Sequence, residues 1–363
     1  MTEAFIPPAK PIIGDEEREA VDRVLRSGMI AQGPEVAAFE TEFSAHFGLD
    51  RACVAVNSGT SGLHLGLLSS GIGAGDEVIV PSFTFAATAN SVALTGATPV
   101  FADIALDDFT LDPASVEAAI TERTKAIMPV HLYGHPAKMD QLQAIADRHG
   151  LLLFEDAAQA HGASLHGIPV GAFGTFAMFS LYPTKNMTSG EGGMVSAANA
   201  EIERNLRLYR NQGMLQQYHN EVVGLNNRMT DIHAAIGRVQ LTKVGAWTKT
   251  RQDNAAFLSA NLAGVTPPAV ADGAVHVYHQ YTIRVTDDRD GFAKALKDEY
   301  NVGSGMFYPV PNHRLKPFQV DVHLEGTERA ALECLSLPVH PSLSQGELER
   351  IVAAANAIAK AGA

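Results

Sequence analysis

The residues best suited to chemistry lie near the middle of the chain. Asp156 closes a short apolar run that begins at Leu151. This pattern is typical of a buried parallel strand that delivers a carboxylate at its carboxyl end. Lys185 follows a second strand-like run, 175–180, and Pro183 ends regular structure just before the lysine. The pattern predicts an acid at the end of one strand and an amine on a loop beside the same sheet.

An amine and a carboxylate in this arrangement suit one kind of cofactor chemistry. A lysine amine that is partly shielded from water can form a Schiff base, and enzymes that use pyridoxal phosphate (PLP) pair such a lysine with a carboxylate facing the pyridine nitrogen. Lys185 and Asp156 fit these two roles. For an isolated pair, an ordinary strand-end aspartate and a solvated loop lysine are the favoured explanation, so the interpretation depends on the surrounding residues.

A glycine- and serine-rich segment, 57–62, forms a candidate phosphate site. It lies between a strand-like run, 53–56, and an apolar helix that begins near Leu63. Glycines allow the backbone N–H groups at the start of a helix to converge on an anion, and the helix dipole adds to the attraction. Because such turns are common before helices, the segment alone is only a weak indication of phosphate binding.

Strand-like and helix-like segments alternate through the first half of the chain. Strands are expected at 77–80, 98–104 and 125–130, and helices at 15–27, 113–120 and 140–149. This alternation indicates an α/β fold with a mostly parallel sheet between helices. The glycines of the segment 71–81 precede a strand instead of following one, so we reject a dinucleotide-binding fingerprint there.

The length of the chain, 363 residues, exceeds what one hydrophobic core usually holds. We therefore expect a large domain over residues 1–245 and a smaller α+β domain over residues 246–363, with roughly the first 12 residues packed on the small domain. A long helical tract, 231–264, leads into the second domain, and residues 277–285 alternate like a half-buried strand.

Composition argues against several classes of protein. The net charge of −13 argues against non-specific binding to nucleic acid. The chain shows no secretory signal and no segment apolar enough to span a bilayer, so we expect a soluble cytoplasmic protein without membrane or nucleic-acid partners. Cys53 and Cys334 lie among apolar residues, and we expect both to be buried reduced thiols.

No metal site is expected. His131 and His135 are four residues apart, but the glycine and proline around them deny the pair a shared helical face. The other histidines are scattered along the chain.

Three motifs carry a resemblance to a known family. The segments EDAAQAHGA (155–163), FSLYPTKN (179–186) and GEGGMV (190–195) resemble the core motifs of the DegT/StrS-type nucleotide-sugar aminotransferases. These are PLP enzymes of the aspartate aminotransferase fold, fold type I. The likeness extends from residue 27 to residue 344 and implies a seven-stranded, mostly parallel sheet in the large domain.

The resemblance assigns roles to individual residues. It implies that Lys185 forms the Schiff base with PLP and that Asp156 faces the ring nitrogen. It also implies that Gln159 contacts the ring hydroxyl and that Phe85 stacks on the pyridine face. The positions matching the family's phosphate ligands are Gly59, Thr60, Ser61, Ser180 and, reaching into the site of a partner subunit, Asn226.

The substrate side is less well defined. The resemblance places the loop that contains Ile30 near the substrate sugar, and His313 matches a histidine of the family's substrate loop. Asn312 stands where the family more often has a bulky apolar residue, so the contacts to the sugar are expected to differ. The role of Asn226 requires a homodimer whose two active sites are shared between subunits.

The implied function is transamination. An amino acid, by family likeness L-glutamate, gives its amino group to PLP, and the resulting pyridoxamine phosphate passes it to a keto group of a nucleotide-linked sugar. A PLP-dependent sugar dehydratase is an alternative, but such family members have histidine where this chain has Lys185. A non-catalytic binding or regulatory protein on the same fold is a second alternative.

Overall fold

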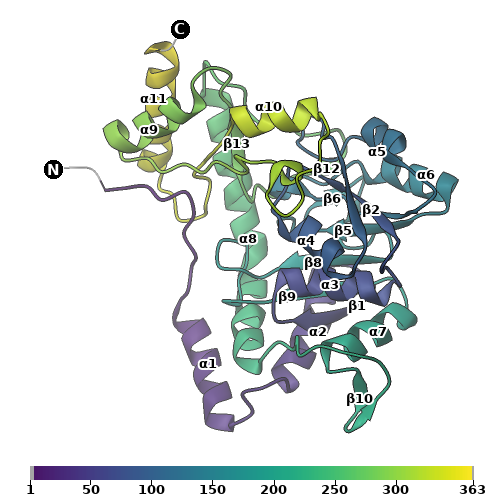
Figure 1. The fold of residues 1–363 in the computed structure, drawn as a ribbon. Coiled ribbons are helices and arrows are strands. Elements are labelled where there is room, and N and C mark those ends of the chain that lie inside the picture. Colours follow the sequence, from purple (N-terminus) through teal and green to yellow (C-terminus); the bar gives the residue numbers. More distant parts are fainter. Residues whose placement is uncertain (1–3, 362–363) are drawn as a thin grey trace.

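The computed structural model describes residues 4–361 of the chain. Its centre is a seven-stranded sheet in the order β1-β9-β8-β5-β4-β2-β3 (Figure 1). The strands are β1 (Ala52–Val56), β2 (Glu77–Pro81), β3 (Thr98–Ala102), β4 (Thr124–Ile127), β5 (Leu152–Asp156), β8 (Phe176–Ser180) and β9 (Gly193–Ala197). Only β9 runs antiparallel to its neighbours in this sheet. The predicted mostly parallel sheet is confirmed.

The central strands of the sheet are mostly apolar and buried. β8 and β9 are buried along their whole length, as expected for strands covered by helices on both faces. β2 begins with a buried charge, Glu77, which accepts hydrogen bonds from Arg123 at 2.9 Å and from Thr121 at 2.5 Å. The start of β2 therefore has polar partners, although the rest of the strand is apolar.

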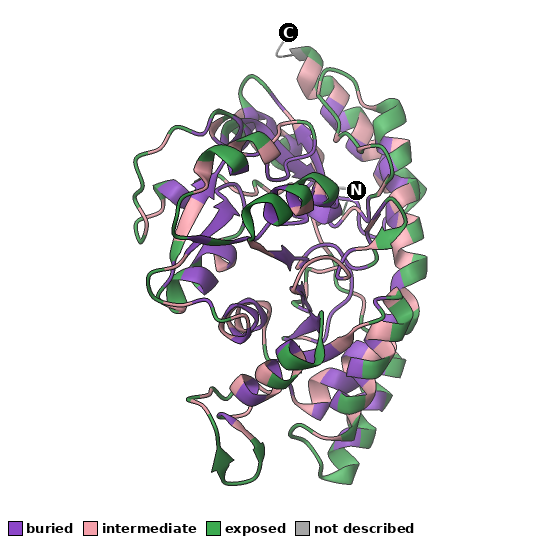
Figure 2. Cartoon of the chain, turned by 90° about the vertical axis from the view of Figure 1, so that its right-hand side faces the viewer, coloured by how far each residue is buried: buried purple, intermediate pink, exposed green. Residues whose placement is uncertain are grey.

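Helices cover both faces of the sheet. On one face α3 (Gly59–Ser69), α4 (Ala87–Leu94) and α7 (Ala200–Arg210) contribute to one hydrophobic cluster with the strands. On the other face lie α2 (Pro34–Phe47), α5 (Pro113–Ala119), α6 (Met139–His149) and the first half of α8 (Asp231–Asn261). Buried residues are concentrated between these layers (Figure 2).

The smaller part of the chain is built around the second half of α8. There β13 (Tyr281–Arg284) pairs with β14 (Cys334–Leu337), and α9 (Arg289–Tyr300) and α11 (Gln345–Ala361) pack beside them. Ile6 lies in this second core, where its backbone N–H donates to the Asn301 carbonyl at 2.9 Å. Because α8 runs unbroken through residues 245 and 246, the domain boundary expected there remains a prediction.

The remaining elements lie at the edges. α1 (Asp15–Ser27) packs along α8 through Ala20 and Val24. The other elements are β6 (Ser164–Leu165), β7 (Ile168–Pro169), β10 (Met214–Gln216), β11 (His219–Asn220), β12 (Ala274–Val275), α10 (Glu325–Glu333) and the short helices η1 (Leu132–Gly134) and η2 (Asn312–Arg314).

The strand expected over residues 277–285 is shorter than predicted. β13 begins only at Tyr281, and Tyr278 adopts a left-handed backbone with φ of 45°. The Val277 N–H donates to the carbonyl of Gly134 at 3.0 Å, a contact with the large domain. This tertiary contact takes the place of strand pairing for the first four residues.

Candidate active site

A cavity of about 690 Å³ lies at the carboxyl ends of the parallel strands. Asp156 reaches it from the end of β5, and Lys185 reaches it from the loop after β8. His279 and Tyr308 approach from the C-terminal part of the chain. Ligand sites of open parallel sheets form at this edge, because the loops after neighbouring strands meet there. The acid and the amine predicted from the sequence therefore share one cavity.

The Asp156 carboxylate is buried and held by two donors. The Thr88 hydroxyl donates to Oδ2 at 2.7 Å, and the Ala158 backbone N–H donates to Oδ1 at 3.2 Å. Burial raises the pKa of Asp156, while these hydrogen bonds and the charge of Lys185 act in the opposite direction. The cavity therefore contains a desolvated acid whose carboxylate is stabilised by hydrogen bonds.

Lys185 is the amine of the site. Its backbone N–H donates to the Tyr182 carbonyl at 3.0 Å, which closes a tight turn after β8. Burial lowers the pKa of the Lys185 amine to about 8, and the Asp156 charge opposes this shift. Nearby, burial and the Lys185 charge lower the pKa of both His161 and His279, so these rings are neutral near pH 7.

The start of α3 forms a cradle beside the end of β8. The Ser58 Oγ caps the helix by accepting the Ser61 backbone N–H at 3.1 Å. A Cβ at Gly59 would lie 3.2 Å from both the Met178 sulfur and the Ser180 Cβ, so the absence of a side chain lets α3 approach β8 closely. The cavity lining here consists of Ser58, Gly59, Thr60 and Ser180.

Gln159 and Phe85 both line this cavity. The Gln159 Oε1 accepts the Tyr133 backbone N–H at 2.7 Å, and its Nε2 donates to the Tyr308 hydroxyl at 3.1 Å. The amide has a second N–H for a ligand. Phe85 is 60% exposed, so one face of its ring is open to stacking.

Four predicted site residues lie away from this lining in the described part of the chain. The Ser61 Oγ accepts a hydrogen bond from the Ser58 hydroxyl at 2.9 Å. His313 is fully buried, and its Nδ1 lies 2.7 Å from the Ser82 Oγ. Ile30 and Asn226 are exposed on the surface of the single chain. The roles suggested for these residues remain predictions, and that of Asn226 concerns the site of a partner subunit.

Sequence reasoning did not single out three residues at or beside the site: Thr88, His279 and Tyr308. Thr88 lies in α4, three residues after Phe85, so a helix-face argument could have found it. His279 and Tyr308 come from the smaller part of the chain. Their approach depends on how the two parts pack, which local sequence patterns do not encode.

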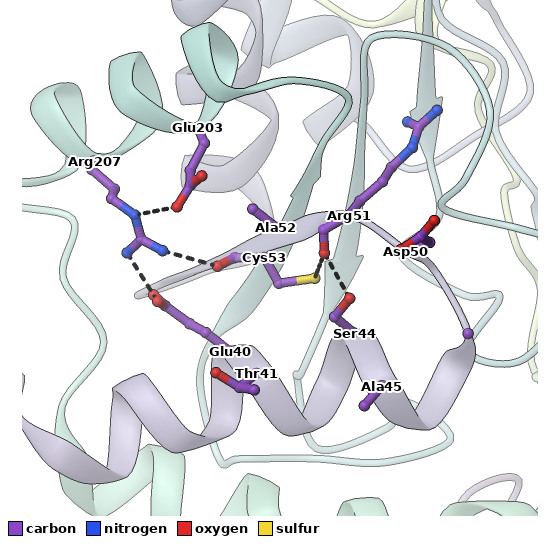
Figure 3. Close-up of a pocket in the computed structure, with 11 residues that line it drawn as sticks. Glu40, Thr41, Ser44, Ala45, Asp50, Arg51, Ala52, Cys53, Glu203 and Arg207 are labelled. Carbon is purple, nitrogen blue, oxygen red and sulfur yellow. Dashed lines mark hydrogen bonds and ion pairs between the residues drawn. The ribbon is translucent and has the colours of Figure 1, made fainter.

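A second cavity, of about 600 Å³, lies between α2, β1 and α7 (Figure 3). Its two arginines already have partners: Arg207 binds Glu40 and Glu203, each at 2.9 Å, and Arg51 donates to three backbone carbonyls. Burial raises the pKa of the Cys53 thiol to about 12, which makes it a poor nucleophile. The acid and the amine predicted for catalysis, Asp156 and Lys185, line the first cavity and not this one.

Two other kinds of feature are absent from residues 4–361. No helix in this range is both long and apolar enough to cross a membrane. The same range contains no group of three or more His, Cys, Asp or Glu side chains placed to bind a metal ion.

Known proteins are similar to this chain in sequence and in fold. Residues 11–356 match the DegT/DnrJ/EryC1/StrS aminotransferase family. The chain is 44% identical over 345 residues to a dTDP-3-amino-3,4,6-trideoxy-alpha-D-glucose transaminase of Streptomyces venezuelae, covering 93% of this chain and 90% of the relative.

Two solved structures extend the comparison. The S. venezuelae DesV in complex with a ketimine intermediate gives a TM-score of 0.93 at 41% identity, covering 98% of this chain and 99% of that chain. The NtdA of Bacillus subtilis with bound cofactor PMP gives a TM-score of 0.92 at 29% identity, covering 99% of this chain and 85% of that chain. These matches confirm the expected fold type I and the expected aminotransferase activity. The chain belongs to the DegT/DnrJ/EryC1/StrS aminotransferase family.

Proposed function

We propose that this protein uses PLP to transfer an amino group from an amino acid, L-glutamate by family likeness, to a keto group of a nucleotide-linked sugar. The observation that carries the proposal is the convergence of Lys185, Asp156 and the α3 cradle in one cavity. The nucleotide-sugar substrate is supported by the name of the S. venezuelae relative.

The residues of the cavity fit PLP. The start of α3 offers backbone N–H groups and the positive end of a helix dipole to the phosphate, and the Thr60 and Ser180 hydroxyls add donors. A Cβ at Gly59 would narrow this cradle. Asp156 supplies a carboxylate for a protonated ring nitrogen, and Lys185 would hold the cofactor aldehyde covalently as a Schiff base.

The protein contributes proton transfer and charge stabilisation. Bound PLP supplies the aldehyde that takes up the amine and a ring that withdraws electrons from the reacting carbon. With a pKa of about 8, the Lys185 amine exchanges protons readily near neutral pH and can act as both base and acid. The Asp156 carboxylate stabilises positive charge on the ring nitrogen, because opposite charges favour each other in a buried site.

A cytoplasmic homodimer with shared sites completes the proposal. The hairpin β10–β11 extends away from the body of the chain in both ribbon views (Figures 1 and 2). Tyr218 is 84% exposed and Val223 is 95% exposed, and apolar side chains of this size favour burial in an interface. Asn226 follows in the same segment and would approach the partner's phosphate cradle, while Ile30 and His313 would support sugar binding.

One experiment separates this proposal from its alternatives. Purified protein loaded with PLP is treated with L-glutamate, and 2-oxoglutarate and the visible band of the cofactor are followed. The proposal requires that 2-oxoglutarate forms in an amount equal to the bound PLP and that this visible band disappears. A panel of nucleotide-linked 3-keto and 4-keto sugars then identifies the acceptor by product mass. A binding or regulatory protein would leave glutamate unchanged, and a dehydratase would release water from the sugar without incorporating nitrogen.

A further inference from the structure

We propose that Thr88 is a positioning residue for Asp156, whose hydroxyl fixes the carboxylate in the orientation and ionisation state that the ring nitrogen of the cofactor requires. The inference deepens the proposed function and rests on it for its catalytic consequence. The hydrogen bond between Thr88 and Asp156 itself involves only side chains of this protein.

The hydrogen bond between the two side chains is short and buried. Thr88 is the second residue of α4, and its Oγ1 lies 2.7 Å from the Asp156 Oδ2. Thr88 is 1% exposed and Asp156 is 4% exposed, so water does not compete effectively for this bond. An ionised carboxylate only accepts, so the threonine hydroxyl is the donor.

A second hydroxyl orients the first. The Thr84 Oγ1 lies 3.3 Å from the Thr88 Oγ1. Because the Thr88 proton points to Asp156, the Thr84 hydroxyl donates to the Thr88 oxygen. Thr84 itself lines the cavity, so this chain of hydroxyls links the cavity wall to the acid.

Other groups do not replace this donor. Asp156 has no ion-pair partner within 4.0 Å in the described chain, and the Lys185 charge acts on it from a greater distance. Within residues 4–361, the only other donor to the carboxylate is the Ala158 N–H, which binds the opposite oxygen at 3.2 Å. Removal of the Thr88 hydroxyl therefore leaves Oδ2 without a fixed donor in a desolvated site.

The backbone of Asp156 is held independently of Thr88. Its N–H donates to the Pro129 carbonyl at 3.0 Å, and its carbonyl accepts the His131 N–H at 3.0 Å. Loss of the hydroxyl should therefore affect the carboxylate and not the strand. This separation makes the proposal testable with an isosteric substitution.

The test compares Thr88→Val, which keeps shape and removes the hydroxyl, with Thr88→Ser, which keeps the hydroxyl. Thr124→Val is the matched control, because Thr124 is also buried but its hydroxyl accepts the Thr121 N–H at 2.9 Å, at the start of β4. The first measurement uses cofactor-free protein labelled with ¹³C at aspartate carboxyls, with the Asp156 signal assigned by its loss in Asp156→Asn.

We expect the Asp156 signal to titrate at higher pH in Thr88→Val than in the wild type, and Thr88→Ser to stay close to the wild type. In PLP-loaded protein, ¹⁵N-labelled cofactor should show a less protonated ring nitrogen in Thr88→Val. Turnover should fall roughly tenfold or more, while the KM for the amino donor changes little, because a hydrogen bond to a charged group is lost. Thr124→Val should match the wild type in each measurement.

The role of Thr88 and the proposed PLP-dependent function would be contradicted by different results. An unchanged Asp156 titration in a folded Thr88→Val protein overturns the inference, whatever the cofactor does. If Thr88→Val does not fold, a Thr88→Ser protein with a raised Asp156 titration also overturns it, because the hydroxyl is still present. If the titration shifts as expected but wild-type Lys185 does not join PLP, the inference about Asp156 holds and the proposed function fails.

Discussion

Glu155 and Asp156 are consecutive residues at the end of β5, and their carboxylates bind different parts of the molecule. Asp156 lines the cavity, whereas Glu155 accepts the backbone N–H groups of Gly171 at 2.8 Å and Phe173 at 2.9 Å. The Glu155 Oε2 also lies 3.0 Å from the His131 Nε2. Side chains alternate across a strand, so adjacent acids point to opposite faces. One strand end thus supplies both the acid of the site and an anchor for the loop before β8.

The anchoring role predicts a loss of stability in Glu155→Gln. The variant keeps the side-chain volume but places an amide N–H₂ among buried donors, so at least one hydrogen bond is lost and another becomes repulsive. We expect the free energy of unfolding to fall by about 2–4 kcal/mol, measured by urea denaturation. Glu117→Gln is the control, because Glu117 binds Arg148 and His149 at the surface, and it should leave the urea midpoint nearly unchanged. Equal midpoints for the two variants would contradict the anchoring role.

The other acid should affect turnover and not folding. In Asp156→Asn the amide oxygen can still accept the Thr88 hydrogen bond, so the local structure should be kept. Lys185 and the start of α3 are unchanged, so PLP should remain bound. The neutral amide no longer stabilises a protonated ring nitrogen, and we expect turnover with L-glutamate to fall by about 100-fold or more. Single-turnover formation of 2-oxoglutarate measures this effect directly. Full activity in this variant would remove Asp156 from its proposed role.

Much of the site was accessible from the sequence for a physical reason. Parallel strands place their carboxyl ends at one edge, so Asp156 and the loop bearing Lys185 had to meet once both runs were recognised as strands. The same logic placed the glycines at the start of α3 at this edge. The local sequence patterns and the geometry of a parallel sheet were therefore sufficient to predict that these groups meet.

The contribution of the smaller part of the chain could not be predicted in this way. Residues 277–285 alternate like a strand, yet the first four residues follow contacts with Tyr133 and Gly134 instead of pairing in a sheet. The resulting bend brings His279 to the cavity. The strand preference of residues 277–280 is overridden by their packing against residues distant in sequence. Periodicity alone therefore predicted the wrong start of the strand.

The pKa of Lys185 predicts how PLP attachment depends on pH. With a pKa of about 8, roughly a tenth of the Lys185 amines are neutral at pH 7, far more than for an ordinary lysine. The initial rate at which cofactor-free protein joins PLP, trapped by borohydride and located by peptide mass, should therefore rise with pH to a midpoint near 8. Lys185→Ala should abolish trapping, and Lys249→Ala, which removes an exposed lysine of α8, should not change it. A midpoint above pH 10 would show that the amine is not desolvated.

The close packing of α3 on β8 predicts that replacing Gly66 lowers the free energy of unfolding. A Cβ at Gly66 would lie 2.5 Å from a ring carbon of Phe176, so Gly66→Ala must displace the helix or the ring. We expect a loss of about 1–3 kcal/mol in the free energy of unfolding measured by urea denaturation. We also expect weaker PLP binding, because the start of α3 is the proposed phosphate site. Gly73→Ala is the matched control, since no atom lies within 4 Å of its added Cβ. Equal stability of the two variants would show that α3 can move without cost.

The buried ring of His161 predicts an acid-sensitive fold. His161 is fully buried and packs 5.4 Å from the ring of Phe179 and 6.4 Å from that of Phe43, measured between centroids. Burial, assisted by the Lys185 charge, lowers its pKa to about 3, whereas in the unfolded chain it is about 6.5. Between these values the unfolded state binds the extra proton, so stability is lost as the pH falls below 6.5, by about 1.4 kcal/mol per pH unit.

His161→Phe should remove this dependence, because phenylalanine does not titrate. Urea denaturation of cofactor-free protein at pH 7.5 and pH 5.0 measures the effect, and the wild type should lose about 2 kcal/mol more than the variant between these two conditions. Burial also lowers the pKa of His276 and His279, but both remain in the variant, so their effects cancel in the comparison. A constant offset between wild type and variant at both pH values would mean that His161 becomes protonated in the folded protein. The ring would then have access to water or a counter-charge, which conflicts with its position among the aromatic side chains.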